Sequence, residues 1–287
     1  GSPFKHAMEK DATYLLQLDP DRLLHRFHRN AGLPVKGEVY GGWESEGLSG
    51  HTLGHYLSAC AIFFANTGRP EFRQRVDYIT QELARCQAAR KTGYVGAIPD
   101  EDTLFAKVAR GEIRSSGFDL NGGWAPWYTV HKLMAGLVDA YLHCHSQPAL
   151  TIVLGMADWA DGILRHLTEE QRLKMLQCEY GGMNEVLANV YAITGEQRYL
   201  DLSYKFHDDF VLDKLAQRVN PLPGKHANTN VPKAIGAARR YELTGKEADG
   251  TIAAFFWDAM VRHHTYVIGG NSNYEYCGEP GKLNDML

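Results

Sequence analysis

Apolar residues recur every three to four positions in several stretches of the chain, and each such stretch predicts a helix with one buried face. Residues 3–29 predict two helices, or one helix interrupted at an Asp-Pro pair. Residues 51–65 predict a helix that ends at Thr67-Gly68, and residues 70–89 predict its partner. The chain therefore begins with helices joined by tight polar turns.

The same device of helix, polar turn and helix recurs further along. Additional copies lie within residues 132–166, 186–215 and 231–264, and the Thr-Gly stops at Thr194 and Thr244 lie 50 positions apart. A period of roughly 50 residues is typical of stacked helical pairs. Four such pairs predict an all-α fold, either an open superhelix of hairpins or a closed ring whose inner helices line a cavity. Long connections rich in Gly, Trp, Asn and Tyr favour the ring.

Composition narrows the class of protein. The chain has 287 residues, of which 44% are hydrophobic and 22% are charged, as in ordinary globular proteins with a sizeable core. The net charge of -4 and the lack of a basic stripe argue against a nucleic-acid partner. No apolar run approaches the roughly 18 residues of a membrane span, so we expect no membrane partner. Nothing indicates an oligomeric state.

The cysteines are scattered, and no two of them form a CxxC pair. A zinc site made by cysteines within this chain is therefore not expected. Cys60 and Cys86 lie in apolar helical surroundings, which predicts that their thiols are buried and unreactive. The five are Cys60, Cys86, Cys144, Cys178 and Cys277. This usage does not decide the compartment, although a periplasmic or secreted location is favoured over the cytoplasm.

The loop at 266–281 carries the most site-like composition. Two glycines are followed by polar and aromatic residues, two carboxylates at Glu275 and Glu279, and a Gly-Glu-Pro-Gly turn that can hold one side chain rigidly. Such a composition is also that of a plain surface loop.

Polar side chains stand where successive predicted inner helices begin. His51 and His55 have the i, i+4 spacing of a zinc site but lack the glutamate of a metalloprotease, so ligand contact and structural hydrogen bonding stay open beside metal binding. Glu185 suits a helix N-terminus, either as a dipole partner or as a group that faces the cavity. His226 precedes a further helix, for which Asn228 or Thr229 is the expected cap.

A turn rich in aromatic residues precedes another helix. Trp124 and Trp127 offer flat faces that suit the C–H surface of a sugar ring, although packing between helices explains them equally well. His131 follows on the same helix as a candidate hydrogen-bonding group. Repeated polar placement at helix starts predicts a pocket at one end of the ring.

Several of these stretches resemble the β-L-arabinofuranosidase type of glycoside hydrolases, families 127 and 146. The resemblance rests on the loop GGNSNYEYCGEPGKLND and on Gly50–Ser58, which matches a Gly-His-x-x-Gly-His-Tyr-Leu-Ser element. It implies an (α/α)6 toroid-type barrel, of which residues 1–287 would be an incomplete, C-terminally truncated part. It also implies sugar contacts for His131 and His226. Gly1-Ser2 has the look of a cloning scar.

The same resemblance implies a retaining mechanism on terminal β-L-arabinofuranose or a related sugar. Glu279 would be the general acid/base, and a zinc-bound cysteine beyond Leu287 would be the nucleophile. Zinc is thus expected in the full-length enzyme, with ligands outside this chain and none within it. Cys277 departs from the aromatic residue commoner at this position, and we expect it to fill an apolar space. The chain alone is expected to be inactive.

Two other functions stay open at this point. A sugar epimerase or polysaccharide lyase on a helical ring would use His131 or His226 as a base and would need no zinc. A non-catalytic carbohydrate-binding fragment would bind sugar without turnover.

Overall fold

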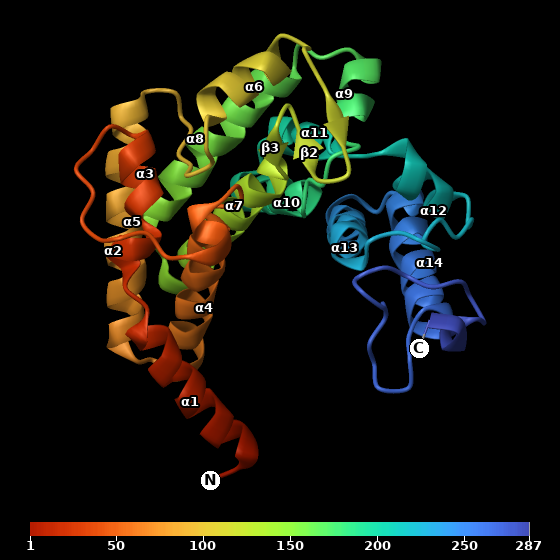
Figure 1. The fold of residues 1–287 in the computed structure, drawn as a ribbon, viewed down its shortest axis with the longest axis horizontal. Helices are drawn as coiled ribbons and strands as arrows, with labels where there is room; N and C mark the ends of the chain where they lie inside the picture. The colour runs from red at the N-terminus through yellow and green to blue at the C-terminus, as the bar shows by residue number, and fades with distance from the viewer. Residues whose placement is uncertain (287) are drawn as a thin grey trace. The chain divides into compact units, whose positions relative to one another are not determined.

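The computed structural model describes residues 1–286, and this part of the chain is built almost wholly from helices (Figure 1). The predicted all-α class is confirmed. Three two-residue strands, in the order β1-β2-β3, stand between helices α6 and α7. The strands are β1 (Ser115–Ser116), β2 (Asp119–Leu120) and β3 (Gly123–Trp124). None of the described helices is both long and apolar enough to cross a bilayer.

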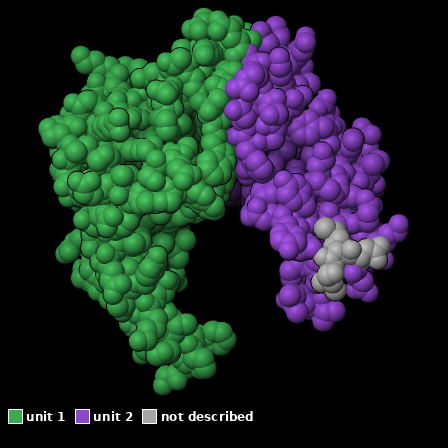
Figure 2. Space-filling model, viewed as in Figure 1, with its two compact units in different colours: residues 1–112, 120–166 green, residues 113–119, 167–287 purple. Residues whose placement is uncertain are grey.

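The chain divides into two compact units (Figure 2). Unit 1 comprises residues 1–112 and 120–166, and unit 2 comprises residues 113–119 and 167–287. The sequence predicts one incomplete domain, and its helical pattern gives no sign of this division into units. Each unit has its own helical hairpins.

Unit 1 is organised around two helices whose backbones touch. A Cβ atom at Gly54 of α4 would lie 2.1 Å from the carbonyl oxygen of Lys132 on α7, and one at Gly136 would lie 2.4 Å from the carbonyl oxygen of Gly54. Only glycine permits this approach. The helices of unit 1 are α1 (Pro3–Gln17), α2 (Pro20–Leu23), α3 (His25–Asn30), α4 (His51–Thr67), α5 (Pro70–Arg90), α6 (Glu101–Ala109), α7 (Pro126–Cys144) and α8 (Gln147–Leu164).

Unit 2 repeats the close approach with a side chain in place of a backbone. A Cβ atom at Gly236 of α13 would lie 2.2 Å from the amide of Asn184 on α10, and that amide donates to the carbonyl of Lys233 at 2.9 Å. Asn184 is fully buried, so this hydrogen bond fixes the two helices to each other. The helices of unit 2 are α9 (Glu169–Met175), α10 (Met183–Thr194), α11 (Gln197–Lys205), α12 (Lys214–Ala216), α13 (Ala227–Thr244) and α14 (Glu247–His263).

The three predicted Thr-Gly stops end helices α4, α10 and α13 by one mechanism. The glycine that follows each helix has a positive φ, between 67° and 73°. The hydroxyl of the preceding threonine donates to the carbonyl four residues earlier, as Thr194 does to Val190 at 2.8 Å. The same hydroxyl accepts the backbone N–H of the residue two positions later, which is Glu196 in this case. The turn residues thus satisfy the groups that the helix end leaves open.

One predicted helix is wrong in its continuity. The stretch 198–215 is broken after α11, passes through a π-helical turn at Asp209–Asp213 and resumes as α12. The cause is Asp208, which is fully buried and whose carboxylate accepts the backbone N–H groups of Val211 and Leu212. A buried carboxylate that caps a new turn ends the preceding helix.

Candidate functional site

The predicted site residues fall into both units, and each group is described within its own unit. His51, His55, Trp124 and His131 belong to unit 1, whereas Glu185, His226 and Glu279 belong to unit 2.

In unit 1, Glu44 caps the helix that begins at His51. Gly50 is the N-cap residue, has a φ of 101° and offers no side chain. The Glu44 carboxylate instead accepts the N–H of Gly50 at 2.8 Å and that of Thr52 at 3.0 Å. Burial of Glu44 opposes its charge, but hydrogen bonds from His51 and these two residues outweigh burial and lower its pKa. Sequence analysis missed this role.

The same carboxylate helps to fix the tautomer of His51. The Nδ1 atom of His51 lies 2.6 Å from the carbonyl oxygen of Leu48 and 3.1 Å from Oε1 of Glu44. Because both neighbours can only accept, Nδ1 must carry the proton. In the neutral ring, Nε2 is therefore a hydrogen-bond acceptor.

The rings of Trp43, Tyr128 and His55 adjoin that of His51, the ring of Trp124 adjoins that of Trp43, and we call these five residues the aromatic platform. Between ring centroids, Trp43 lies 5.9 Å from His51 and 6.3 Å from Trp124. Tyr128 and His55 lie 6.1 and 6.0 Å from His51 by the same measure. Trp43 and Trp124 are 58% and 37% exposed. Exposed indole faces beside a hydrogen-bonding imidazole are the groups that a sugar ring requires.

The two tryptophans that sequence analysis left open have different roles. Trp127 is buried, and the centroid of its ring lies 5.0 Å from that of Phe105 and 5.6 Å from that of Trp159. It is a core residue. Trp124 keeps an exposed face and stays a candidate for sugar contact.

His131 and His55 are neutral near pH 7. Burial, together with the charge of Lys132, lowers the pKa of His131 to about 3. The side chain of His55 is exposed, but desolvation by its surroundings and the charge of Lys132 still lower its pKa, to about 4. His131 is buried, and its Nδ1 atom has no hydrogen-bond partner among residues 1–286. A buried nitrogen without a partner is unusual and marks a place where a ligand hydroxyl could bind.

In unit 2, His226 itself caps helix α13. Its Nδ1 atom accepts the backbone N–H of Thr229 at 3.2 Å. Our expectation that Asn228 or Thr229 would be the cap is therefore wrong, because the imidazole precedes both and reaches the first turn. Since Nδ1 accepts, Nε2 carries the proton and donates to Oε2 of Glu275 at 3.2 Å.

The loop that carries Glu275 is held in a tight turn. Asn273 and Tyr276 exchange two backbone hydrogen bonds, each of 3.0 Å, around Tyr274 and Glu275, whose φ values are 46° and 71°. Two left-handed residues at these positions are typical of a type I′ turn, where Asn-Gly is preferred. The N–H of Ala227 donates to the carbonyl of Glu275 at 2.8 Å, so the turn is attached to the start of α13.

A pocket of about 460 Å³ opens beside His226. Its lining combines the rings of Phe118, Phe210 and Tyr276 with polar groups that include His226 and Lys233. The ring of Phe118 lies 5.1 Å from that of His226. Apolar rings with a few fixed polar groups are typical of small-ligand sites.

The base of this pocket is a buried ion pair. The ammonium of Lys233 lies 2.7 Å from Oδ2 of Asp208, and both side chains are at most 2% exposed. Tyr180 donates its hydroxyl to the same carboxylate at 2.8 Å. Despite burial, the charge and hydrogen bond of Lys233 hold the pKa of Asp208 below its usual range.

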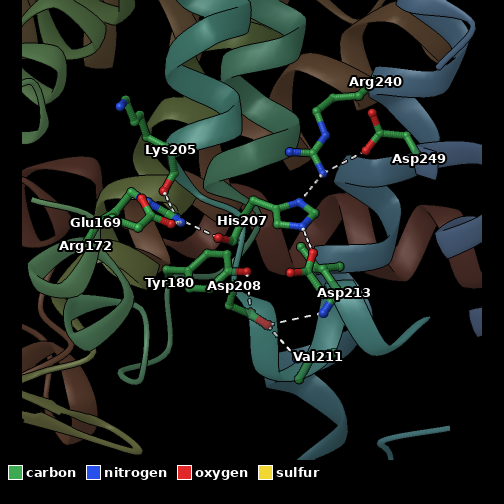
Figure 3. A network of polar contacts seen from close by, with 11 residues as sticks. Glu169, Arg172, Tyr180, Lys205, His207, Asp208, Val211, Asp213, Arg240 and Asp249 are labelled. Carbon is green, nitrogen blue, oxygen red and sulfur yellow. Dashed lines mark hydrogen bonds and ion pairs between the residues drawn. The ribbon is translucent and has the colours of Figure 1, made fainter. Parts of the chain in front are cut away.

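Further polar contacts fix α13 behind the pocket (Figure 3). Arg240 is fully buried, pairs with Asp249 at 3.0 Å and approaches Nδ1 of His207 at 3.3 Å. His207 in turn donates from Nε2 to Asp213 at 2.8 Å. Lys233 and Arg240 are seven residues apart, so both point from one face of the helix that begins after His226.

Two predicted residues of unit 2 lie outside the pocket lining. Glu279 is exposed, and its charge acts on His264, where it opposes the lowering of the pKa that burial causes. Glu185 is half-buried in the first turn of α10 and accepts from Asn189 at 3.4 Å along the same helix. The roles of Glu279 and Glu185 stay predictions.

Cys60, Cys86 and Cys277 are buried, as predicted. Burial raises the pKa of Cys60 and of Cys86 to about 12, and that of Cys277 to about 11. Cys277 lies in the hydrophobic core of unit 2, as expected for an apolar filling. Within residues 1–286, no group of three or more His, Cys, Asp or Glu side chains is placed to hold a metal ion.

Comparisons with known proteins place this geometry in context. The profile described as β-L-arabinofuranosidase, GH127 catalytic domain, matches residues 1–287. No curated protein matches the sequence. A crystal structure of a GH127 β-L-arabinofuranosidase from Geobacillus stearothermophilus T6 is similar, with a TM-score of 0.64 and 17% identity over 92% of this chain. A second solved GH127 β-arabinofuranosidase is similar with a TM-score of 0.61 and 18% identity over 90% of this chain.

The likeness to the two solved structures is one of fold. This chain covers 43% and 41% of their lengths, so it spans less than half of either.

Proposed function

This chain belongs to the glycoside hydrolase family 127 of β-L-arabinofuranosidases, and on that premise we propose that the whole protein hydrolyses terminal β-L-arabinofuranosides or related glycosides. The observation that carries the proposal is the setting of His226. The ring has a fixed tautomer and stands at the mouth of a pocket lined by aromatic side chains and polar groups. Such a pocket suits a sugar, which offers C–H surface and hydroxyls together.

The proposed mechanism is a retaining hydrolysis. One group protonates the departing oxygen and later deprotonates water, while a second group attacks the anomeric carbon from about 5 Å away. We assign the first role to Glu279. By the resemblance of the sequence, the second would be a zinc-bound cysteine.

The residues described do not fit a zinc site. They offer no cluster of metal ligands, and each cysteine among them is buried. The proposed mechanism therefore includes no step that these residues would perform on a metal ion.

The low pKa of His131 argues against this residue as the base in the epimerase or lyase alternative. A general base is most effective when its pKa lies near the working pH. The pKa of His131 is about 3, so it is a weak base that would rarely carry a proton away. Its proposed role is to hydrogen-bond a sugar hydroxyl.

The acid role can be tested with Glu279→Gln in the full-length protein. We expect kcat/KM to fall at least about a hundredfold for glycosides with poor leaving groups and much less for aryl glycosides with good ones, because acid assistance matters less there. Steady-state kinetics on both substrate types measure this. Glu196→Gln, at an exposed turn of the same unit, is the matched control. Equal losses on both substrate types would contradict the assignment.

A further inference from the structure

A second pocket lies in unit 1, beside the aromatic platform. It has a volume of about 420 Å³, within the range of small-ligand sites. Trp124 lines it and also packs against Trp43, which packs against His51. The pocket and the platform thus share Trp124 and form one continuous surface. None of the residues that we expect to catalyse hydrolysis lines this pocket.

The floor of this pocket is built by close approaches that require glycine. A Cβ atom at Gly47 would lie 2.9 Å from Cβ of Trp124, and one at Gly123 would lie 2.1 Å from a methyl group of Leu104. These contacts hold the indole in place while 37% of the residue stays exposed. An exposed indole whose position is fixed offers a flat apolar face on which a sugar ring can stack.

Two lining residues adopt left-handed backbone conformations. Asp100 has a φ of 51° and Asn121 a φ of 53°. Asn121 is held there by its amide, which donates to the carbonyl of Glu112 at 2.9 Å. The Asp100 side chain makes no cap hydrogen bond to helix α6, which begins after it. Residues in such conformations concentrate at ligand sites.

The charges in the lining indicate what the pocket would hold. Asp100 and Lys107 both contribute, and Thr103 adds a hydroxyl. The charge of Lys107 also acts on Glu112, although neither Asp100 nor Lys107 is within 4 Å of an oppositely charged group among the described residues. One carboxylate and one ammonium can bind several hydroxyls at once, whereas a carboxylate ligand would be drawn to Lys107 and repelled by Asp100.

We propose that this pocket of unit 1 is a binding site for a neutral sugar residue. The indole of Trp124 stacks on its C–H face, and Asp100 and Lys107 bind its hydroxyls. This inference rests on the proposed function, because it assigns the pocket to the class of ligand on which the whole protein would act.

Asp100 allows a test that does not threaten the fold. Asp100→Gly removes the carboxylate, while glycine adopts a positive φ without strain. Lys91→Gly is the matched control, since Lys91 has a φ of 60° in the same unit and does not line the pocket. Thermal melting should show both variants to be at least as stable as the parent.

The experiment is a titration of the ¹⁵N-labelled chain with L-arabinobiose, a neutral disaccharide, and with digalacturonate. We expect arabinobiose to shift the backbone amides of 100–107 and 121–124. Asp100→Gly should weaken its binding about tenfold or more, the loss expected for a hydrogen bond to a charged group. Lys91→Gly should leave the Kd unchanged.

The possible failures are distinguishable. Shifts confined to the surroundings of His226, with no effect of Asp100→Gly, overturn the second site and leave the proposed function standing. Tighter binding of digalacturonate than of arabinobiose at 100–107 overturns the neutral class of ligand. If neither sugar shifts any amide, both this inference and the proposed sugar site are contradicted.

Discussion

His51 and His226 lie at the starts of helices α4 and α13, yet their imidazoles carry the proton on different nitrogen atoms. His51 donates from Nδ1 to the Leu48 carbonyl and keeps Nε2 as an acceptor. His226 accepts at Nδ1 from the Thr229 N–H and donates from Nε2. A sugar hydroxyl both donates and accepts, so within its own unit His51 can accept from such a group through Nε2, whereas His226 presents an N–H donor. A histidine at a helix start can therefore present either an acceptor or a donor at Nε2, and the backbone group that contacts Nδ1 decides which.

The two helix starts also differ in their support. Helix α4 begins at a glycine and depends on the carboxylate of Glu44, which comes from the preceding loop. Helix α13 is capped by His226 itself, and its site depends on the buried pair of Lys233 and Asp208. The difference predicts distinct sensitivities to substitution.

The largest effect should come from the ion pair on the His226 side. Lys233→Met leaves the Asp208 carboxylate buried without its partner, so we expect the free energy of unfolding to fall by about 3–5 kcal/mol. Urea unfolding followed by circular dichroism measures this, with the exposed Lys214→Met as control. A loss no larger than that of the control would show that the pocket does not depend on the pair.

The next effect should come from the cap on the His51 side. Glu44→Ala removes the acceptor of two backbone N–H groups in a buried place, which should cost about 2 kcal/mol of unfolding free energy. Glu44→Gln should cost less, because an amide oxygen still accepts. Glu46→Ala, an exposed neighbour, is the control. Equal effects of the two alanine variants would contradict the capping role.

This second effect should depend on pH with a definite sign. The folded-state pKa of Glu44 is lower than its usual value, so the unfolded chain binds the proton more tightly. Its contribution is complete above the usual glutamate pKa, about 4.3, and is lost as the pH falls through the depressed value. The difference in stability between the parent and Glu44→Gln should therefore shrink on acidification.

The smallest effect is spectroscopic and bears directly on the contrast between the histidines. In ¹⁵N spectra of the imidazoles in their neutral form, we expect the unprotonated nitrogen of His51 to be Nε2 and that of His226 to be Nδ1. No change in stability is involved. Finding the same tautomer at both residues would remove the contrast.

Sequence patterns predicted those parts of the molecule that local chemistry determines. The stops at Gly68, Gly195 and Gly245 were visible because a threonine and a glycine suffice to end a helix. Trp124 and Trp127 could not be separated, because they lie three positions apart in the sequence and only tertiary packing exposes one and buries the other.

Other features depend on partners distant in the chain. Glu44 caps α4 from outside the helix, and the break at Asp208 depends on Lys233, 25 residues away. Neither contact follows from spacing. Burial of Cys277 was predicted from its type, whereas the platform around His51 required coordinates.

The backbone contact between Gly54 and Lys132 has a consequence for how rigid the platform is. With no layer of side chains between the two main chains, neither helix can slide or rotate without a collision between peptide groups. His51 and Tyr128 occupy the first turns of these same helices, and their rings are 6.1 Å apart. The distance between the two rings is therefore set by direct contact between main chains, and it should change little on heating until the unit unfolds.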